Sequence, residues 1–216
     1  MESFHCDKIW FGPLPPFKFE DPALRVKDVS LPNLLKSSAK LTNIQPGLGV
    51  IVEGVQLNQL DDAAKDELAY LISHRKVMAF AKQDLIDDGP TAQQEFMDYS
   101  GKRNYQPVSG SPPGYVMLGL LQGPEIGGDT VFAATDAAYK RLSPALQSLL
   151  DKLQAVHTSI KMIGHAKAAG GLVRKDPVET VHLLVRVHPV TGQKCIFING
   201  GFIARIVGLK NQRERC

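Results

Sequence analysis

Cysteine is scarce in this sequence, where Cys6, Cys195 and Cys216 are the only three among 216 residues. Their odd number and wide separation exclude a disulfide framework, and the lack of a Cys-x-x-Cys pair excludes the usual thiol metal site. Free thiols are typical of reducing compartments. We therefore expect an intracellular protein with a cytoplasmic location.

Long apolar runs and an excess of one charge are also missing. No hydrophobic stretch approaches the roughly 20 residues that a bilayer-spanning helix needs. The 25 basic and 22 acidic residues give a net charge of +3, without the Lys and Arg blocks typical of nucleic-acid binding. We expect neither a membrane nor a nucleic acid as partner, and this composition is compatible with a homo-oligomer.

Proline is concentrated near the start of the chain, at Pro13, Pro15, Pro16, Pro22 and Pro32. Because proline fixes φ and lacks a backbone donor, regular structure is disfavoured there. We divide the sequence into a Pro-rich N-terminal arm, residues 1–40, and one partial domain, residues 41–216.

Helix signals occur at three places after the arm. Apolar residues at helical spacing predict a helix over residues 62–75. Thr91 is the expected cap of a second helix that ends near residue 99, and Ser143 followed by Pro144 predicts the start of a third. The third helix has an apolar stripe that we expect to be buried: Leu146, Leu149, Leu150 and Leu153.

Strand signals are more numerous. They lie at residues 47–54, 76–81, 115–121, 129–133, 183–188 and 195–199, and the last two are expected to form a hairpin. Hairpins and long returns argue against a βαβ parallel sheet. The expected fold class is α+β, mainly β, with a jelly-roll-like core and flanking helices.

Two groups of residues could bear chemistry. Gly127-Gly128-Asp129-Thr130 joins a flexible backbone to a hydroxyl that can bond a carboxylate, although composition alone favours a plain structural turn with a solvent-facing threonine. His182 and His188 would share a face of one continuous strand and could start a metal site, but no carboxylate lies close to either in sequence. The pattern favours hydrogen-bonded structural histidines over a metal site.

Four segments, in this order, resemble the taurine/sulfonate dioxygenase family, and most of all its fungal sulfonate dioxygenases. They are residues 46–57, 113–144 with the Gly-Gly-Asp-Thr motif, 185–192 and 198–206. The resemblance implies a double-stranded β-helix, or jelly roll, that uses Fe(II) and 2-oxoglutarate as cofactors. It further implies oxidation of a sulfonate or another small molecule.

The resemblance assigns three site residues. Thr130 matches the threonine that binds 2-oxoglutarate in the family, and Phe202 matches an aromatic residue of the substrate pocket. Gln106 lies where the family has a substrate-facing histidine before proline, so this histidine is replaced.

The iron ligands of the family have no counterpart in this sequence, so we assign no metal ligand and no catalytic residue. A His-x-Asp pair should lie between Pro107 and Tyr115, yet residues 109–114 lead directly into the next predicted strand, as though a segment were skipped. The pair at His5 and Asp7 precedes the fold, and we interpret it as a coincidence. In the family, the second histidine and a 2-oxoglutarate-binding arginine follow the segment that ends here near residue 210, so we expect an incomplete domain.

Three hypotheses therefore stand together. The protein is a dioxygenase of this family, an inactive degenerate or truncated relative, or a module that binds a small carboxylate or a partner protein. A fold alone does not decide among them.

Overall fold

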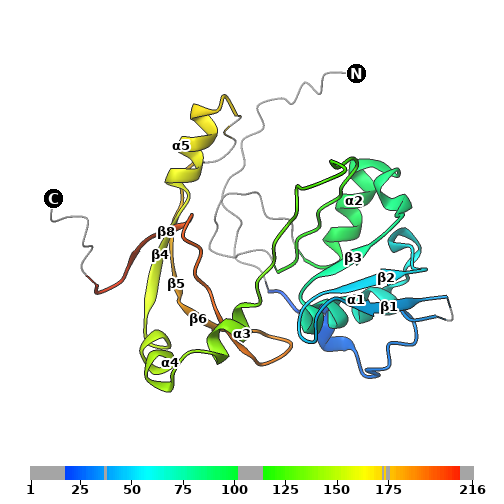
Figure 1. Cartoon of the computed structure of the whole chain (residues 1–216), viewed down its shortest axis with the longest axis horizontal. Helices are drawn as coiled ribbons and strands as arrows, with labels where there is room; N and C mark the ends of the chain where they lie inside the picture. Colours follow the sequence, from blue (N-terminus) through cyan, green and yellow to red (C-terminus); the bar gives the residue numbers. More distant parts are fainter. Residues whose placement is uncertain (1–17, 37, 102–113, 172, 174–175, 210–216) are drawn as a thin grey trace.

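The computed structural model describes residues 18–36, 38–101, 114–171, 173 and 176–209. Two groups of elements stand apart in Figure 1. The N-terminal group comprises residues 18–101 and the C-terminal group comprises residues 135–209. Residues 114–134 form the connecting segment, which runs beside α2 before it enters α3 (Figure 1).

The N-terminal group is built on a three-stranded sheet. Its elements are η1 (Pro22–Arg25), β1 (Lys40–Asn43), β2 (Val50–Glu53), η2 (Leu57–Gln59), α1 (Asp62–Arg75), β3 (Met78–Phe80), η3 (Asp84–Ile86) and α2 (Gly89–Asp98). The strand order is β1-β2-β3, with β1 antiparallel and β3 parallel to β2. A hydrophobic cluster fills its centre, formed by Leu31, Leu34, Val50, Val52 and Val55.

The parallel pair of β2 and β3 corrects the expectation that no βαβ unit would occur. Helix α1 connects the two strands, and a parallel pair needs such a crossover because a tight turn cannot reverse the chain twice. The prediction was wrong because it was based on the strands of the whole sequence, whereas the βαβ unit comprises only β2, α1 and β3.

Helix starts in this group were partly predicted. Helix α1 has its predicted bounds, and Asp61 caps it by accepting a hydrogen bond of 2.8 Å from the Ala64 amide. The expected cap at Thr91 is wrong, because α2 begins at Gly89 and Thr91 lies inside it. Pro90 at the start of the helix supplies a pre-set φ and needs no donor there.

The C-terminal group contains one antiparallel sheet and one hairpin. Its elements are α3 (Thr135–Lys140), α4 (Pro144–Leu150), β4 (Gln154–Thr158), α5 (Ile160–Ala168), β5 (Glu179–Leu183), β6 (Val185–Val187), β7 (Lys194–Ile196) and β8 (Ile203–Ile206). The sheet order is β5-β4-β8, and β6 pairs with β7 in the predicted hairpin. Within the described residues, no helix combines the length and apolarity needed to cross a membrane.

The predicted strand over residues 183–188 is wrong as one element. The chain leaves one sheet at Leu183 and starts the hairpin at Val185, with the fully buried Leu184 between them. The Leu184 amide donates to the Leu153 carbonyl at 3.0 Å, and its own carbonyl accepts from the Phe197 amide at 2.7 Å. Leu184 is therefore a corner that joins the two sheets.

Two further expectations fail, one about the buried stripe of α4 and one about two strands. Ser143 caps α4 as predicted, with the Leu146 amide at 3.4 Å from its hydroxyl, but Leu146 and Leu149 are exposed. The strands predicted at 115–121 and 129–133 are absent from the described structure, since no described strand pairs with these residues. A strand needs a partner for its backbone groups, and the sequence pattern does not supply one.

Candidate functional site

The Gly-Gly-Asp-Thr motif lies in the connecting segment. Gly127 and Gly128 have φ of +81° and +77°, which is the left-handed region that favours glycine. The chain bends at Glu125 and Ile126, directly before this pair of glycines, so a change of direction lies at the start of the motif. Thr130 has an exposed side chain and directly precedes the exposed Val131 and Phe132.

Phe202 lies in the turn before β8 and is half-buried. Its amide donates to the Asn199 carbonyl at 2.9 Å, and its carbonyl accepts from the Thr158 amide at 2.7 Å. Gln106 lies outside the described residues. Within the described part of the chain, no hydrogen bond or ring contact joins Thr130 to Phe202, so their roles remain predictions.

Three rings form a cluster that the sequence argument missed. His157 on β4 stacks on Phe197, with ring centroids 5.0 Å apart, and meets the edge of His182 on β5 at 5.2 Å. Thr180 lies within hydrogen-bond distance of His182, with its hydroxyl 3.1 Å from Nε2. The guanidinium of Arg186 lies over the Phe197 ring at 5.0 Å from its centroid.

His157 is the most deeply placed member of this cluster. It is 3% exposed, and its Nε2 is buried without a hydrogen-bond partner among the described residues. A buried ring nitrogen of this kind can accept from or donate to a ligand. The pairing of β4 with β5 brings His157 and His182 together across 25 residues, and no short sequence motif reveals such a contact.

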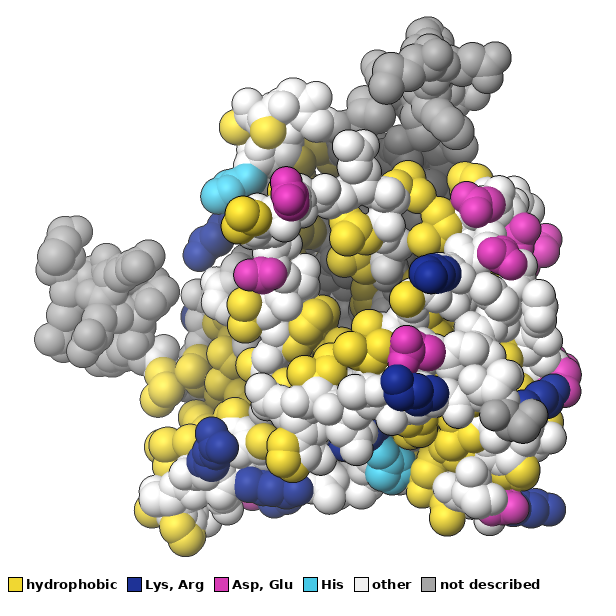
Figure 2. Space-filling view, turned by 45° about the vertical axis from the view of Figure 1, so that its right-hand side comes forward, with side chains coloured by type: hydrophobic (Ala, Val, Ile, Leu, Met, Phe, Trp, Pro, Cys, Tyr) yellow, Lys and Arg dark blue, Asp and Glu magenta, His cyan; other side chains and the backbone are white. Residues whose placement is uncertain are grey.

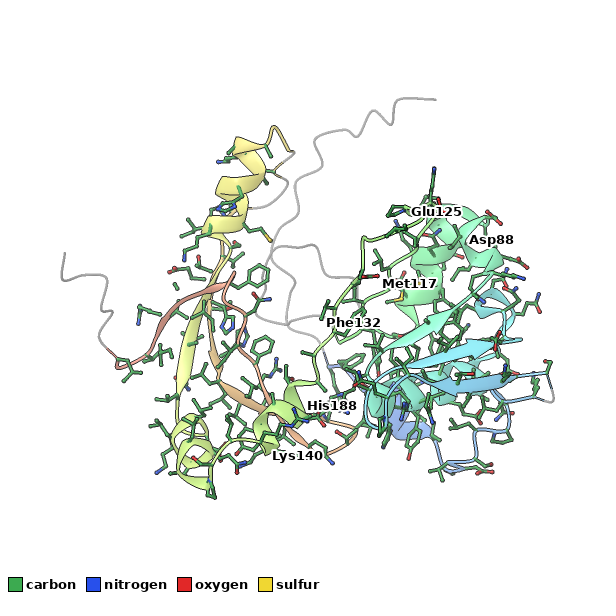
Figure 3. The ribbon with its side chains drawn as sticks, in the orientation of Figure 1. Asp88, Met117, Glu125, Phe132, Lys140 and His188 are labelled. Atoms are coloured by element: carbon green, nitrogen blue, oxygen red, sulfur yellow. The ribbon has the colours of Figure 1, made fainter. Side chains whose placement is uncertain are left out.

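His188 does not join that cluster, contrary to the idea of one strand carrying both histidines. It follows β6 beyond the Leu184 corner, and Figure 3 shows it near Lys140, where the two groups meet. The amides of Val190 and Thr191 donate to its Nδ1 at 3.3 and 3.4 Å. Burial is the largest influence on His188 and lowers the pKa of its imidazole.

Asp136 links the two groups beside His188. Its Oδ2 lies 3.4 Å from the ammonium of Lys76, at the end of α1, and 4.0 Å from that of Lys140. Its Oδ1 is buried without a partner in the described part of the structure. Asp136 raises the pKa of His188 and Lys76 lowers it, so charged groups from both groups of elements influence this imidazole.

None of these arrangements forms a metal centre. No group of three or more His, Cys, Asp or Glu side chains able to hold a metal ion occurs among the residues described above. Among the described residues, no carboxylate completes a group with the two imidazoles, and the facial iron sites of oxygenases need two histidines and a carboxylate. The described residues therefore do not fit an iron ion.

Comparison with known proteins identifies the relatives of this chain. The family model for "Taurine catabolism dioxygenase TauD, TfdA family" matches residues 105–215. An alpha-ketoglutarate-dependent sulfonate dioxygenase of Saccharomyces cerevisiae is 34% identical across 94% of this chain and 60% of its own length. The alpha-ketoglutarate-dependent dioxygenase cnsP of Penicillium expansum is 30% identical across 93% of this chain and 66% of its own length.

Solved structures show the same relationship at the level of fold. A putative alpha-ketoglutarate dependent 2,4-D dioxygenase from Burkholderia xenovorans superposes with a TM-score of 0.61 at 22% identity, over 80% of this chain and 74% of its own. A putative alpha-ketoglutarate-dependent taurine dioxygenase from the same organism gives 0.60 at 23% identity, over 82% and 71%. These likenesses support a fold shared with such dioxygenases.

The chain is shorter than its relatives, and part of the difference is internal. It spans 60% and 66% of the lengths of the two fungal relatives. The alignment with the Saccharomyces cerevisiae protein covers 249 positions, whereas this chain has 216 residues, so at least 33 aligned positions belong to the relative alone. This agrees with the expected skipped segment, whose place between Gly114 and Tyr115 remains a prediction.

Proposed function

Because this chain belongs to the TauD/TfdA family of dioxygenases, we propose that it derives from an enzyme that oxidises a sulfonate or another small organic molecule with 2-oxoglutarate. The observation that carries this proposal is the 34% identity with a sulfonate dioxygenase along nearly the whole chain. Fe(II) and 2-oxoglutarate are the cofactors of the proposed activity. A double-stranded β-helix is the proposed fold of the complete domain, and the cytoplasm is the proposed location.

A second function is favoured by the described side chains. Since these residues do not fit an iron ion, we derive no oxidation step for the chain itself. We propose that the chain as it stands binds a small dicarboxylate without turning it over. Thr130 is the proposed contact, because an exposed hydroxyl beside two left-handed glycines is free to meet a carboxylate.

A succinate assay separates these two functions. Purified protein is incubated with Fe(II), 2-oxoglutarate and taurine, and succinate is measured against a no-protein blank. We expect no succinate above the blank, because the described residues supply no set of ligands that could hold an iron ion for oxygen to bind. Stoichiometric iron binding together with succinate formation would refute the binding-only function.

Ligand binding is tested separately by titration of 2-oxoglutarate, observed by ligand NMR. Thr130→Ala is expected to weaken binding about tenfold or more, because the loss of one hydrogen bond to a charged group costs about 1.5–3 kcal/mol. Thr191→Ala is the matched control, because Thr191 lies in the distant β6–β7 turn. An unchanged affinity of the Thr130 variant would reduce the motif to a structural turn.

A further inference from the structure

We propose that the β6–β7 turn, residues 188–193, is a pH-sensitive element of this chain. The turn is closed while the imidazole of His188 is neutral, and it opens when the imidazole takes up a proton. The basis is the double position of His188, which holds the turn and also lies where the two groups of elements meet (Figure 3). The inference concerns conformation, so it does not depend on the proposed function.

Backbone and side-chain bonds of His188 close this turn together. Its amide donates to the Gln193 carbonyl at 2.8 Å, and its carbonyl accepts from the Gly192 amide at 2.9 Å. Its Nδ1 accepts from the amides of Val190 and Thr191, at 3.3 and 3.4 Å. Since the intervening proline has no amide hydrogen, these are the first two amides after His188 that can donate. The ring is therefore the side-chain acceptor of the turn.

The two amides fix the protonation state of the ring. A backbone amide can only donate, so Nδ1 must offer a lone pair, and the neutral ring carries its hydrogen on Nε2. Uptake of a proton places a hydrogen on Nδ1, where it meets the amide hydrogens of Val190 and Thr191. Both bonds are then lost and three donors face one another. The closed turn is therefore compatible only with the neutral ring.

Ionisable groups from several elements lie around the His188 ring. They are Asp21 before η1, His74 and Lys76 at the end of α1, and Asp136 and Lys140 on α3. The two carboxylates raise the pKa of the imidazole, whereas His74 and Lys76 lower it and burial lowers it most. The ring is therefore neutral above the ordinary histidine pKa of about 6.5, and it takes up its proton only at a lower pH.

Among the described residues, no hydrogen bond joins a carboxylate to this ring. The Asp21 carboxylate accepts from the Ala23 amide at 3.0 Å and from the Tyr115 hydroxyl at 2.7 Å. Oδ1 of Asp136 is buried without a hydrogen-bond partner, so the ring does not donate to it. A charged imidazole is more stable in water than in such a half-buried position. Protonation therefore moves the ring into water and withdraws it from the place where the two groups meet.

Amide NMR of the full chain between about pH 7.5 and pH 5 tests the proposal. We expect the amide signals of Val190 and Thr191 to move upfield in one step, at the pH at which the His188 ring titrates, because they lose their acceptor. Protection of the Gly192 amide against hydrogen exchange should fall at least tenfold in the same step, since its bond closes the turn. His165→Asn is the control, because His165 is exposed on α5, and it should keep both changes.

Two variants separate the hydrogen bonds from the charge. In His188→Asn, the side-chain oxygen can accept from the following amides and does not titrate, so the turn should stay closed at both pH values. His188→Ala has no acceptor, so the Gly192 amide should exchange at least tenfold faster than in His188→Asn. This comparison is made at pH 7.5, so it decides the role of the acceptor without acid.

Four results would overturn the proposal. The His188 ring titrates while the Gly192 amide keeps its protection, or His188→Asn opens at low pH as the unmodified chain does. Equal protection of Gly192 in the alanine and asparagine variants at pH 7.5 is the third. The fourth is loss of protection in β2 in the same step, because the chain would then unfold as a whole. Circular dichroism at pH 7.5 checks that each variant retains its secondary structure.

Discussion

Glu67 shows how one side chain can join two parts of the chain. It is buried on α1, and its carboxylate accepts hydrogen bonds from the Asn33 amide, the Asn33 side chain and the Leu34 amide, at 2.9, 2.6 and 2.7 Å. These bonds hold the segment before β1 against the hydrophobic cluster, since Leu34 belongs to that cluster. A single residue thereby attaches part of the predicted N-terminal arm to the sheet.

Replacing Glu67 with alanine is expected to lower the free energy of unfolding by about 3 kcal/mol, because it leaves buried donors without an acceptor. Urea denaturation followed by circular dichroism measures the change. Glu95→Ala is the matched control on α2, where the side chain is exposed, and it should change stability by less than about 0.5 kcal/mol. Equal losses in the two variants would contradict the anchoring role.

His188 gives stability a pH dependence of known sign. Burial lowers the pKa of His188 in the folded state, with Asp21 and Asp136 opposing this shift and His74 and Lys76 reinforcing it. Below the ordinary histidine pKa of about 6.5, the unfolded chain therefore binds a proton that the folded chain does not bind. This contribution to stability is present at neutral pH and is lost as the pH falls through that value.

We expect His188→Gln to flatten the dependence of unfolding free energy on pH between about pH 7.5 and pH 5. Urea unfolding at several pH values measures this slope. His165→Gln is the control, because His165 is exposed on α5. A slope that persists in the His188 variant would assign the proton uptake to another group.

At the scale of elements, Gly54 allows β2 to end where the preceding segment crosses it. Its φ is +76°, and an added Cβ would overlap the Ser38 carbonyl oxygen. Gly54→Ala is therefore expected to cost about 3 kcal/mol of unfolding free energy. Gly47→Ala, in the turn before β2, has open space around it and should cost less than about 0.5 kcal/mol, as chemical denaturation would show. Similar costs for both would contradict the close approach at Gly54.

Local signals predicted the elements whose partners are close in sequence. Helix α1, the Ser143 cap and the β6–β7 hairpin follow from short patterns and are present. The strands expected at 115–121 and 129–133 have the right composition, but the described part of the chain offers them no partner strand. Figure 2 shows hydrophobic side chains gathered over the middle of one face of the molecule. Strand formation depends on hydrogen bonds to distant residues, so composition alone cannot decide it.

For the molecule as a whole, the family could be predicted from the sequence, whereas only some residues of the candidate site could be. The order of four short segments indicated the family, and the family comparison confirms it. The ring cluster of His157, His182 and Phe197 was not predicted, because it depends on the register between β4 and β5 and on the Leu184 corner. Thr130 and Phe202 were assigned by resemblance, and their roles remain to be tested.

The two groups are expected to differ in local stability. The described hydrophobic cluster lies entirely in the N-terminal group, whereas β5 at the sheet edge exposes Val181 and Leu183. Amides with little buried apolar support exchange through smaller openings. We expect amides of β2 and α1 to exchange at least tenfold more slowly than those of β5 in hydrogen-exchange mass spectrometry. Comparable rates would show that the two groups unfold together.

The Leu184 corner has a consequence for how the folding of this chain can be followed. His157 and His182 belong to one sheet, and Phe197 follows the hairpin on the other side of the corner, with its ring 5.0 Å and 5.5 Å from the two imidazoles. Stacked rings shift one another's proton resonances through ring currents. The chemical shifts of the His157 imidazole protons therefore report whether the two sheets have their native positions relative to each other. A one-residue deletion at Leu184 would remove the ring-current shift while each sheet kept its own strand pairing.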